Sequence, residues 1–342
     1  MKTFILTEGG GKIGFGHIAR CFSLYQAFEE RQIPAQMLIY GYSDVAAILP
    51  ENGYQLVDWI HDSVVRRKLL AGSDLVIIDS MIVSQETVLN IAAQARAVAC
   101  IDDARRITHK SDNTTIIDWT PFAEKEYAPI GGKNSDYLLG TKYISLRKPF
   151  WDVPEREIKE EVASILITMG GGDLRGLSPR LLKILQVEMP SGVRKQVVIG
   201  RGFDESIVTQ LLKMGREDDV ALIFYPGAVE MAAAFGNADI VVSGGGQTLY
   251  ELARMGLPAI AIEVIDNQRL DIAGWHTVGS IDYAGKWNDE KTYDNVASLI
   301  RRLGSSCQCR REMGLKGSES ADGQGARRIV DHLIRKRNEI CI

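Results

Sequence analysis

Long apolar runs are missing from this chain of 342 residues, and so is a regular set of cysteines. No apolar stretch approaches the ~18 residues that mark a membrane-spanning helix, so no membrane span is expected. The five cysteines are an odd number without a framework, which favours reduced thiols in the cytoplasm. No His or Cys near Cys307 and Cys309 completes the ligand set of a structural zinc, so no metal is expected. The cysteines occupy positions 21, 100, 307, 309 and 341.

A basic excess is also missing. Lys and Arg total 40 against 44 Asp and Glu, which gives a formal net charge of -4 at pH 7. A general nucleic-acid-binding protein would carry a basic surface, so this balance argues against a nucleic-acid partner. The chain is long enough for two domains, each with its own core, and it has no low-complexity tract or short repeat. Its first eight residues are too short an apolar stretch for a signal peptide and are expected to form a strand.

The first half alternates short β-branched runs with helix-period segments, the pattern of an α/β fold with a parallel sheet. A helix is expected over residues 16–31. The run at 75–79 is apolar on both faces, which predicts a central strand. Strands are expected at 3–7, 35–40, 54–59, 75–79, 97–101, 115–118 and 137–139.

A second alternation of the same kind follows a proline-containing, charged stretch. We therefore expect one domain over residues 1–148, a solvated linker over 149–163 and a second domain over 164–342. Strands are expected at 164–168, 195–199, 220–224, 238–242 and 259–262, helices at 177–188 and 248–255, and a helical tail from 289 onward.

A glycine-rich loop follows the first expected strand. Residues 9–20 read GGGKIGFGHIAR, and the loop ends at His17, near the start of the first helix. Such a loop exposes backbone amides and lets a ligand approach the main chain, while a histidine there could act as a general base. The alternative is a loop that needs glycine only for its turns, with a histidine that only caps the helix.

Two further glycine loops follow strands in the second half, at 170–172 and 244–246. Ligands of open α/β sheets bind at the carboxyl ends of the strands, so these loops predict a site for an anion such as a diphosphate. Tight turns without a ligand are the alternative.

Several carboxylates and amides stand near these loops. Glu251 falls on the second turn of the helix that the third loop opens, where it could accept both ribose hydroxyls, or it could be an exposed helix residue. The triplet at 266–268 could contact a sugar or phosphate, or cap a helix. Asp79 ends a strand and could orient His17 or a sugar hydroxyl. Asp102 and Asp103 end another strand, where they could form a metal-binding acidic pair, or could cap a helix or bond to the loop.

The segment at 11–20 resembles the signature loop of the UDP-2,4-diacetamido-2,4,6-trideoxy-β-L-altropyranose hydrolases of pseudaminic acid synthesis and of related spore coat polysaccharide proteins. The segments at 77–79, 102–103, 169–171 and 267–268 recur there in the same order. Residues 243–251 and 256–259 also resemble the UDP-binding segment of the peptidoglycan N-acetylglucosaminyltransferase. Both families have the GT-B architecture, so the resemblance implies two Rossmann-like domains whose parallel sheets face a central cleft.

The resemblance also implies roles for matching positions. It implies His17 as general base and Glu251 as ribose ligand. No cofactor is expected. One departure concerns Ser80 and Met81, where the family often has His-Tyr, and this puts the identity of the sugar in question. The implied binding residues for the UDP-sugar are Gly14, Gly16, Arg20, Gly170, Gly171, Phe224, Tyr225, Gly246, Gln247, Thr248, Asn267 and Gln268.

The expected function is hydrolysis of a UDP-linked amino-sugar to UDP and free sugar. Histidine has an intrinsic pKa of about 6.5, which suits a base that activates water near neutral pH. Backbone amides and helix dipoles would stabilise the departing diphosphate without a metal. A GT-B glycosyltransferase with the same donor is the alternative, and a non-catalytic sugar-nucleotide sensor is a third possibility.

Overall fold

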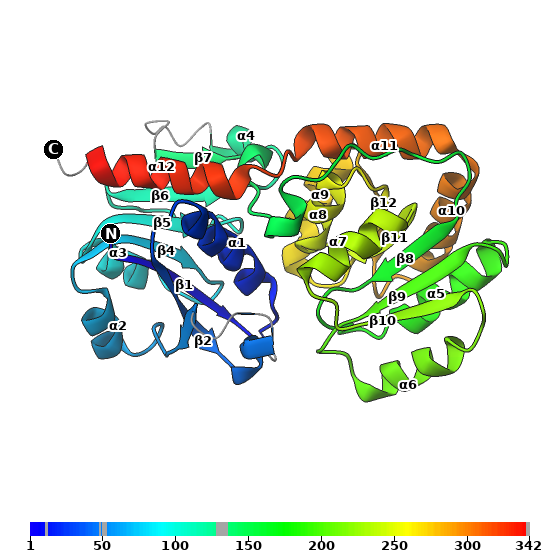
Figure 1. Ribbon diagram of the computed structural model, residues 1–342, viewed down its shortest axis with the longest axis horizontal. Coiled ribbons are helices and arrows are strands. Elements are labelled where there is room, and N and C mark those ends of the chain that lie inside the picture. The colour runs from blue at the N-terminus through cyan, green and yellow to red at the C-terminus, as the bar shows by residue number, and fades with distance from the viewer. Residues whose placement is uncertain (11–12, 48, 50–52, 128–135, 340–342) are drawn as a thin grey trace. The chain divides into compact units, whose positions relative to one another are not determined.

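The computed structural model describes residues 1–10, 13–47, 49, 53–127 and 136–339 (Figure 1). Gly11 and Lys12 of the first glycine loop, and Cys341, lie outside these residues. The chain divides into two compact units: unit 1 is Met1–Lys148 with Gly323–Ile342, and unit 2 is Pro149–Asp322. Among the described residues, no helix is both long and apolar enough to cross a membrane.

Unit 1 contains a seven-stranded parallel sheet in its described part, with the order β3-β2-β1-β4-β5-β6-β7. Val76, Ile77 and Ile78 of β4 are all buried, so the prediction of a central strand covered on both faces is confirmed. The strands are β1 (Thr3–Gly9), β2 (Ala35–Gly41), β3 (Tyr54–Leu56), β4 (Ser73–Asp79), β5 (Ala95–Ile101), β6 (Thr114–Asp118) and β7 (Tyr137–Leu139). The helices are α1 (Gly16–Glu30), α2 (Ser63–Leu70), α3 (Gln85–Ala92), α4 (Ala123–Tyr127) and α12 (Gly325–Glu339), with 3-10 turns at Ser43–Ala47 and Thr141–Tyr143.

Unit 2 contains a six-stranded parallel sheet, again in its described part, with the order β10-β9-β8-β11-β12-β13. Its core consists of the aliphatic side chains of these strands and of the helices that cover them. The strands are β8 (Ser164–Thr168), β9 (Arg194–Ile199), β10 (Val220–Phe224), β11 (Ile240–Gly244), β12 (Ala259–Glu263) and β13 (Ile281–Lys286). The helices are α5 (Ser178–Glu188), α6 (Glu205–Met214), α7 (Ala228–Asn237), α8 (Thr248–Arg254), α9 (Arg269–Val278), α10 (Lys291–Ser305) and α11 (Cys307–Ser320), with a 3-10 turn at Asp266–Gln268.

Each sheet has one place where the strand order reverses. In unit 1 the chain builds outward from β1 on one side and from β4 on the other, and Thr7 of β1 pairs with Asp79 of β4. In unit 2 the corresponding neighbours are β8 and β11, where Thr168 pairs with Ser243. The loops that leave such a strand pair diverge and open a crevice at the carboxyl edge. The glycine loops of the sequence follow β1, β8 and β11.

The last helix, α12, belongs to unit 1, although the sequence predicted one domain over 164–342. Ile329 and Leu333 of α12 are fully buried, and the helix packs against α1 and β5 (Figure 1). Arg31, the C-cap residue of α1, donates to Asp331 at 2.5 Å, and Lys336 donates to Thr115 of β6 at 2.9 Å. The apolar face of α12 therefore completes the core of unit 1.

The expected solvated linker over 149–163 is attached to unit 2 at both ends. Phe150 and Trp151 are fully buried, and Arg254 donates to the carbonyl of Phe150 at 3.1 Å. Buried Arg310 donates to the carbonyls of Lys159 and Glu160 at 2.7 and 2.8 Å. The segment is charged as predicted, but two arginines and two aromatic side chains fix its path.

Candidate functional site

The loop after β1 is shaped by glycine. Gly10 and Gly14 have φ values of +89° and +94°, which side chains rarely adopt, and the amide of Gly10 donates to the carbonyl of Gly14 at 2.9 Å. A Cβ at Gly14 or at Gly16 would meet no atom within 4 Å. The glycine at 14 is thus required by the backbone, and the space beside it is open.

His17 and Asp79 meet where the strand order of unit 1 reverses. His17 lies in the first turn of α1, Asp79 is the last residue of β4, and Nδ1 of the ring is 2.8 Å from Oδ1 of the carboxylate. Asp79 is fully buried, whereas the His17 side chain keeps 17% of its exposure. An ionised carboxylate only accepts hydrogen bonds, so a neutral ring that donates to Asp79 carries its proton on Nδ1 and its lone pair on Nε2.

Arg20 lies one turn further along α1 and holds the same carboxylate. Its Nε donates to Oδ2 of Asp79 at 2.7 Å, its Nη2 donates to Oδ1 at 2.6 Å, and its Nη1 donates to Asp103. Burial alone would raise the pKa of Asp79, but the charges of Arg20 and His17 outweigh it and hold that pKa well below its usual value. Asp79 is therefore ionised at neutral pH. The sequence predicted Arg20 as a substrate ligand, whereas in the structure its guanidinium is paired with two carboxylates.

The two acids after β5 have different partners. Asp102 accepts from the amides of Arg106 and Ile107 at 2.9 and 2.7 Å, which is the loop bonding considered as an alternative, whereas Asp103 pairs with Arg20. Within the described ranges, no group of three or more His, Cys, Asp or Glu could hold a metal ion.

Ser80 and Met81, which replace the His-Tyr of the resembling family, are fixed by buried Glu8 of β1. One oxygen of Glu8 accepts from the Ser80 hydroxyl, and the other accepts from the Met81 amide at 2.8 Å. Arg106 donates to the carbonyl of Met81 at 2.6 Å. The backbone after Asp79 is thus held from both sides.

In unit 2 the loops after β8 and β9 are joined through glycines. Gly170 has a φ of +77°, and the amide of Gly202 donates to the carbonyl of Gly171 at 2.9 Å. A Cβ at Gly200 would lie 2.3 Å from that carbonyl oxygen, so only glycine allows this contact. Arg201, between Gly200 and Gly202, was not predicted as a site residue. A Gly-X-Gly sequence directly after a strand could have indicated a ligand-binding loop here.

The loop after β11 is fixed by Gln268. The side-chain oxygen of Gln268 accepts from the amides of Gly245 and Val264 at 3.2 and 2.9 Å, so it ties this loop to the end of β12 and does not cap α9. Asn267 beside it is exposed. Three residues at the start of α8 are only half-buried and so accessible: Gly246, Gln247 and Thr248.

Glu251 is 3% exposed, so the alternative of an exposed helix glutamate is wrong. It lies in the first turn of α8, not in the second turn as predicted. Burial removes this carboxylate from water, and the free-energy cost of that desolvation is high unless the carboxylate forms hydrogen bonds.

Phe224 and Tyr225 are exposed aromatic residues at the carboxyl end of β10. They are 42% and 46% exposed, and their rings meet edge to face with centroids 5.8 Å apart. Tyr225 has a φ of +50°, and its amide donates to the carbonyl of Ile199 at 2.9 Å. The guanidinium of Arg201 lies 5.3 Å from the Tyr225 ring. A cation and two aromatic rings thus occupy the same edge of the sheet as the glycine loops.

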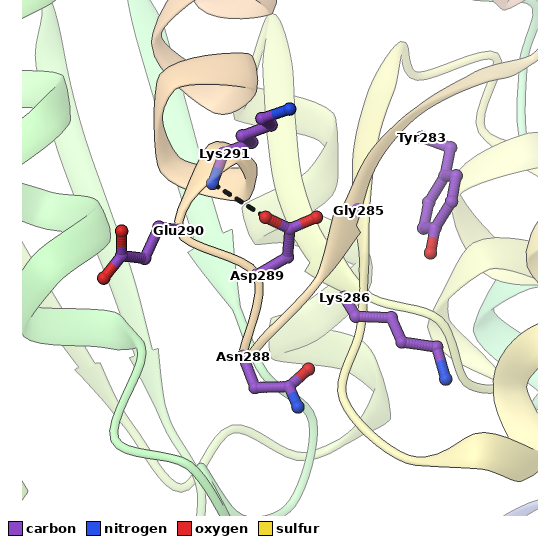
Figure 2. A pocket seen from close by; sticks show the side chains of 7 residues that line it. All are labelled: Tyr283, Gly285, Lys286, Asn288, Asp289, Glu290 and Lys291. Carbon is purple, nitrogen blue, oxygen red and sulfur yellow. Dashed lines mark hydrogen bonds between the residues drawn. The ribbon is translucent and has the colours of Figure 1, made fainter.

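A wide, shallow pocket of about 680 Å³ lies at the end of β13 (Figure 2). Its lining carries both signs of charge, and Asp289 accepts from the Lys291 amide at 3.0 Å. None of the predicted site residues lines it, and it lies two strands from the reversal at β11. Its lining residues are Tyr283, Gly285, Lys286, Asn288, Asp289, Glu290 and Lys291. We therefore place the candidate site of unit 2 at the loops after β8 and β11.

Comparison with curated proteins finds relatives at low identity, and no protein-family model matches the chain. The chain is 26% identical over 280 residues to an uncharacterised protein of Methanocaldococcus jannaschii. It is 21% identical over 284 residues to the pseudaminic acid cytidylyltransferase and UDP-2,4-diacetamido-2,4,6-trideoxy-β-L-altropyranose hydrolase of Helicobacter pylori. It is 21% identical over 337 residues to the spore coat polysaccharide biosynthesis protein SpsG of Bacillus subtilis.

These relatives differ in length. The matches cover 79%, 83% and 96% of this chain. The chain spans about half of the first two relatives, 57% of the archaeal protein and 48% of the Helicobacter protein, but 97% of SpsG. SpsG is therefore similar along its whole length.

Solved structures show the fold. S. aureus MnaA with UDP matches with a TM-score of 0.68 at 13% identity, and the match covers 99% of this chain and 98% of that one. MurG of Acinetobacter baumannii matches with a TM-score of 0.64 at 16% identity, covering 98% of this chain and all of that one. The fold is of the GT-B type, with two Rossmann-like domains, and this prediction is confirmed.

Proposed function

We propose that this protein hydrolyses a UDP-linked di-N-acetylated trideoxy amino-sugar to UDP and the free sugar, as a step of nonulosonic (pseudaminic) acid biosynthesis. The observation that carries the proposal is the hydrogen bond between His17 and Asp79, which leaves Nε2 of a partly exposed ring as a base. The similarity to the Helicobacter hydrolase and to SpsG supports the substrate class.

In the proposed reaction His17 acts as a general base. Nε2 takes a proton from a water molecule while the water oxygen bonds to the anomeric carbon. The bond between that carbon and the oxygen of the β-phosphate breaks, and UDP leaves with the electron pair. A single displacement inverts the anomeric configuration. A positioned base contributes about 10² to 10⁴ in rate.

Unit 2 is proposed to bind the UDP. The amides of the loops after β8 and β11 would hold the diphosphate, which suits a protein of net charge -4 because dipoles replace lysines. Glu251 would accept the ribose hydroxyls, and Asn267 with Gln268 would contact the sugar. Phe224 and Tyr225 would lie against the uracil, with Arg201 beside them. No cofactor or metal is proposed.

A GT-B glycosyltransferase is the second candidate, because residues 243–251 resemble the UDP-binding segment of the peptidoglycan N-acetylglucosaminyltransferase. In that case an acceptor hydroxyl would take the place of water, and UDP release would require the acceptor. Hydrolysis predicts UDP release from the sugar nucleotide and water alone.

The test is a panel of UDP-amino-sugars incubated with the protein and followed by phosphorus and proton NMR. We expect UDP and a free, inverted sugar without any acceptor. We expect His17→Asn to lose this turnover. The asparagine amide can still donate a hydrogen bond to Asp79, but it has no atom that corresponds to Nε2. Turnover only with an acceptor would assign the protein to the transferases instead.

A further inference from the structure

We propose that Asp103 is a positioning residue that sets the tautomer of His17 through Arg20. Its catalytic consequence rests on the proposed function, whereas the hydrogen-bond network is a property of unit 1. The network joins α1, the end of β4 and the loop after β5.

Nδ1 of His17 has two neighbours that make opposite demands on it. Oδ1 of Asp79, at 2.8 Å, accepts a hydrogen bond, so it favours a proton on Nδ1. Nη2 of Arg20, at 3.1 Å, donates, so it favours a lone pair there. If the arginine prevailed, the proton of the neutral ring would move to Nε2, which could then no longer act as a base.

Asp103 favours the proton on Nδ1 because it fixes the orientation of the Arg20 guanidinium through Nη1. Nη1 of Arg20 donates to Asp103, while Nε and Nη2 form a two-point contact with Asp79 at 2.7 and 2.6 Å. The guanidinium is planar and rigid, so three fixed contacts determine its orientation. In this orientation one hydrogen of Nη2 is directed to Oδ1 of Asp79, and Nδ1 lies within donating distance of the same oxygen.

The charges of the network favour the same outcome. Arg20 contributes one positive charge, and Asp79 and Asp103 contribute one negative charge each, so the network has a net charge of -1 when His17 is neutral. A proton that arrives on Nε2 during water attack brings this sum to zero. Without the Asp103 charge the same proton would leave a buried excess of positive charge, which is unfavourable at low dielectric.

A purely structural role is the alternative, in which Asp103 only neutralises a buried arginine. The two possibilities differ in what they predict for the imidazole. If Asp103 only neutralises Arg20, its replacement changes the stability of the fold and leaves the imidazole as it was. If Asp103 positions Arg20, its replacement also changes which ring nitrogen of His17 carries the proton. The Asp103 side chain is 21% exposed and lies outside the apolar cluster of unit 1, and Arg20 keeps Asp79 as a partner when Asp103 is replaced.

The test combines nitrogen-15 NMR of the histidine side chains with kinetics. The signals of His17 are assigned by their loss in His17→Asn. We expect wild type to show His17 protonated at Nδ1, and Asp103→Asn to show a mixture with the Nε2-protonated form. Asp103→Glu, which keeps the charge, should retain the Nδ1 form. Asp112→Asn, at an exposed acid of the same loop, is the matched control and should behave as wild type.

In kinetics with the UDP-amino-sugar, Asp103→Asn should lower kcat about tenfold and leave KM within about twofold, because the base is affected and substrate binding is not. Asp103→Glu should recover most of the loss. An unchanged tautomer in Asp103→Asn overturns the inference even if the protein is a hydrolase. Absence of turnover in wild type overturns the proposed function, and the NMR experiment still tests the network.

Discussion

Nδ1 of His17 lies 2.8 Å from Oδ1 of Asp79, and this contact joins the first turn of α1 to the carboxyl end of β4. The two residues are 62 positions apart, and the parallel pairing of β1 with β4 brings them together. The contact fixes the ring of a partly exposed histidine against a carboxylate that is ionised at neutral pH.

Replacement of Asp79 by Asn should reduce turnover strongly. An asparagine can offer its amide NH₂ to Nδ1, which would favour the tautomer with the proton on Nε2, so kcat should fall by about 10² to 10⁴ with a smaller effect on KM. Steady-state kinetics on the UDP-amino-sugar checks this. Activity within about threefold of wild type would contradict the assigned role of Asp79.

The same carboxylate should contribute to stability in a pH-dependent way. Its pKa is lowered in the folded protein, so its contribution is fully present above the unfolded pKa of about 3.9 and is lost as the pH falls toward the folded pKa. The difference in unfolding free energy between wild type and Asp79→Asn should stay constant from about pH 7 to 5 and shrink below about pH 4. Urea unfolding of both proteins across this pH range measures the difference in unfolding free energy. A difference that grows as the pH falls would contradict the lowered pKa of Asp79.

The glycine contact between the loops after β8 and β9 gives a third prediction. In Gly200→Ala the new Cβ would lie 2.3 Å from the Gly171 carbonyl oxygen, so the loops must separate. We expect a stability loss of about 1–3 kcal/mol and weaker UDP binding. The control is Gly192→Ala, where a Cβ meets nothing within 4 Å. Urea unfolding and calorimetry with UDP distinguish the two, and equal effects of both substitutions would refute the prediction.

The buried Glu251 should matter for UDP affinity. If its carboxylate accepts the ribose hydroxyls, Glu251→Gln removes charged hydrogen bonds of about 1.5–3 kcal/mol, which corresponds to about 10- to 150-fold weaker binding. Glu205→Gln, at an exposed residue of α6, serves as the control. Isothermal titration with UDP gives both affinities, and unchanged affinity in the Glu251 variant would remove this residue from the proposed site.

Much of the fold could be predicted because its signals are local. A short stretch of sequence is enough to recognise the apolar run of β4, which is buried on both faces. The same is true of the glycines that follow β1, β8 and β11, which predict loops at the carboxyl edges of two sheets. Asp79 could be considered as a partner of His17 because Asp79 ends one strand and His17 follows the loop at the end of another. Residues 11–12 of the first loop lie outside the described part of the structure.

Long-range choices could not be read from the sequence. The apolar stripe of α12 predicts a helix, but it does not specify which of two cores the stripe covers. Strand β13 was not predicted because it is irregular, with Gly285 at a φ of +130° and a shift of register against β12. The pairing of Arg20 with Asp103, and not with Asp102, depends on how the loop after β5 turns.

The role of His17 is tested most directly by comparing wild type with His17→Asn on the UDP-linked di-N-acetylated trideoxy amino-sugar. Proton NMR identifies the first sugar anomer released, and phosphorus NMR follows the release of UDP. We expect wild type to release UDP and the inverted sugar in water alone. We expect His17→Asn to bind UDP but to release it at least about 10²-fold more slowly from the sugar nucleotide. Equal rates of UDP release by the two proteins would show that His17 is not the base.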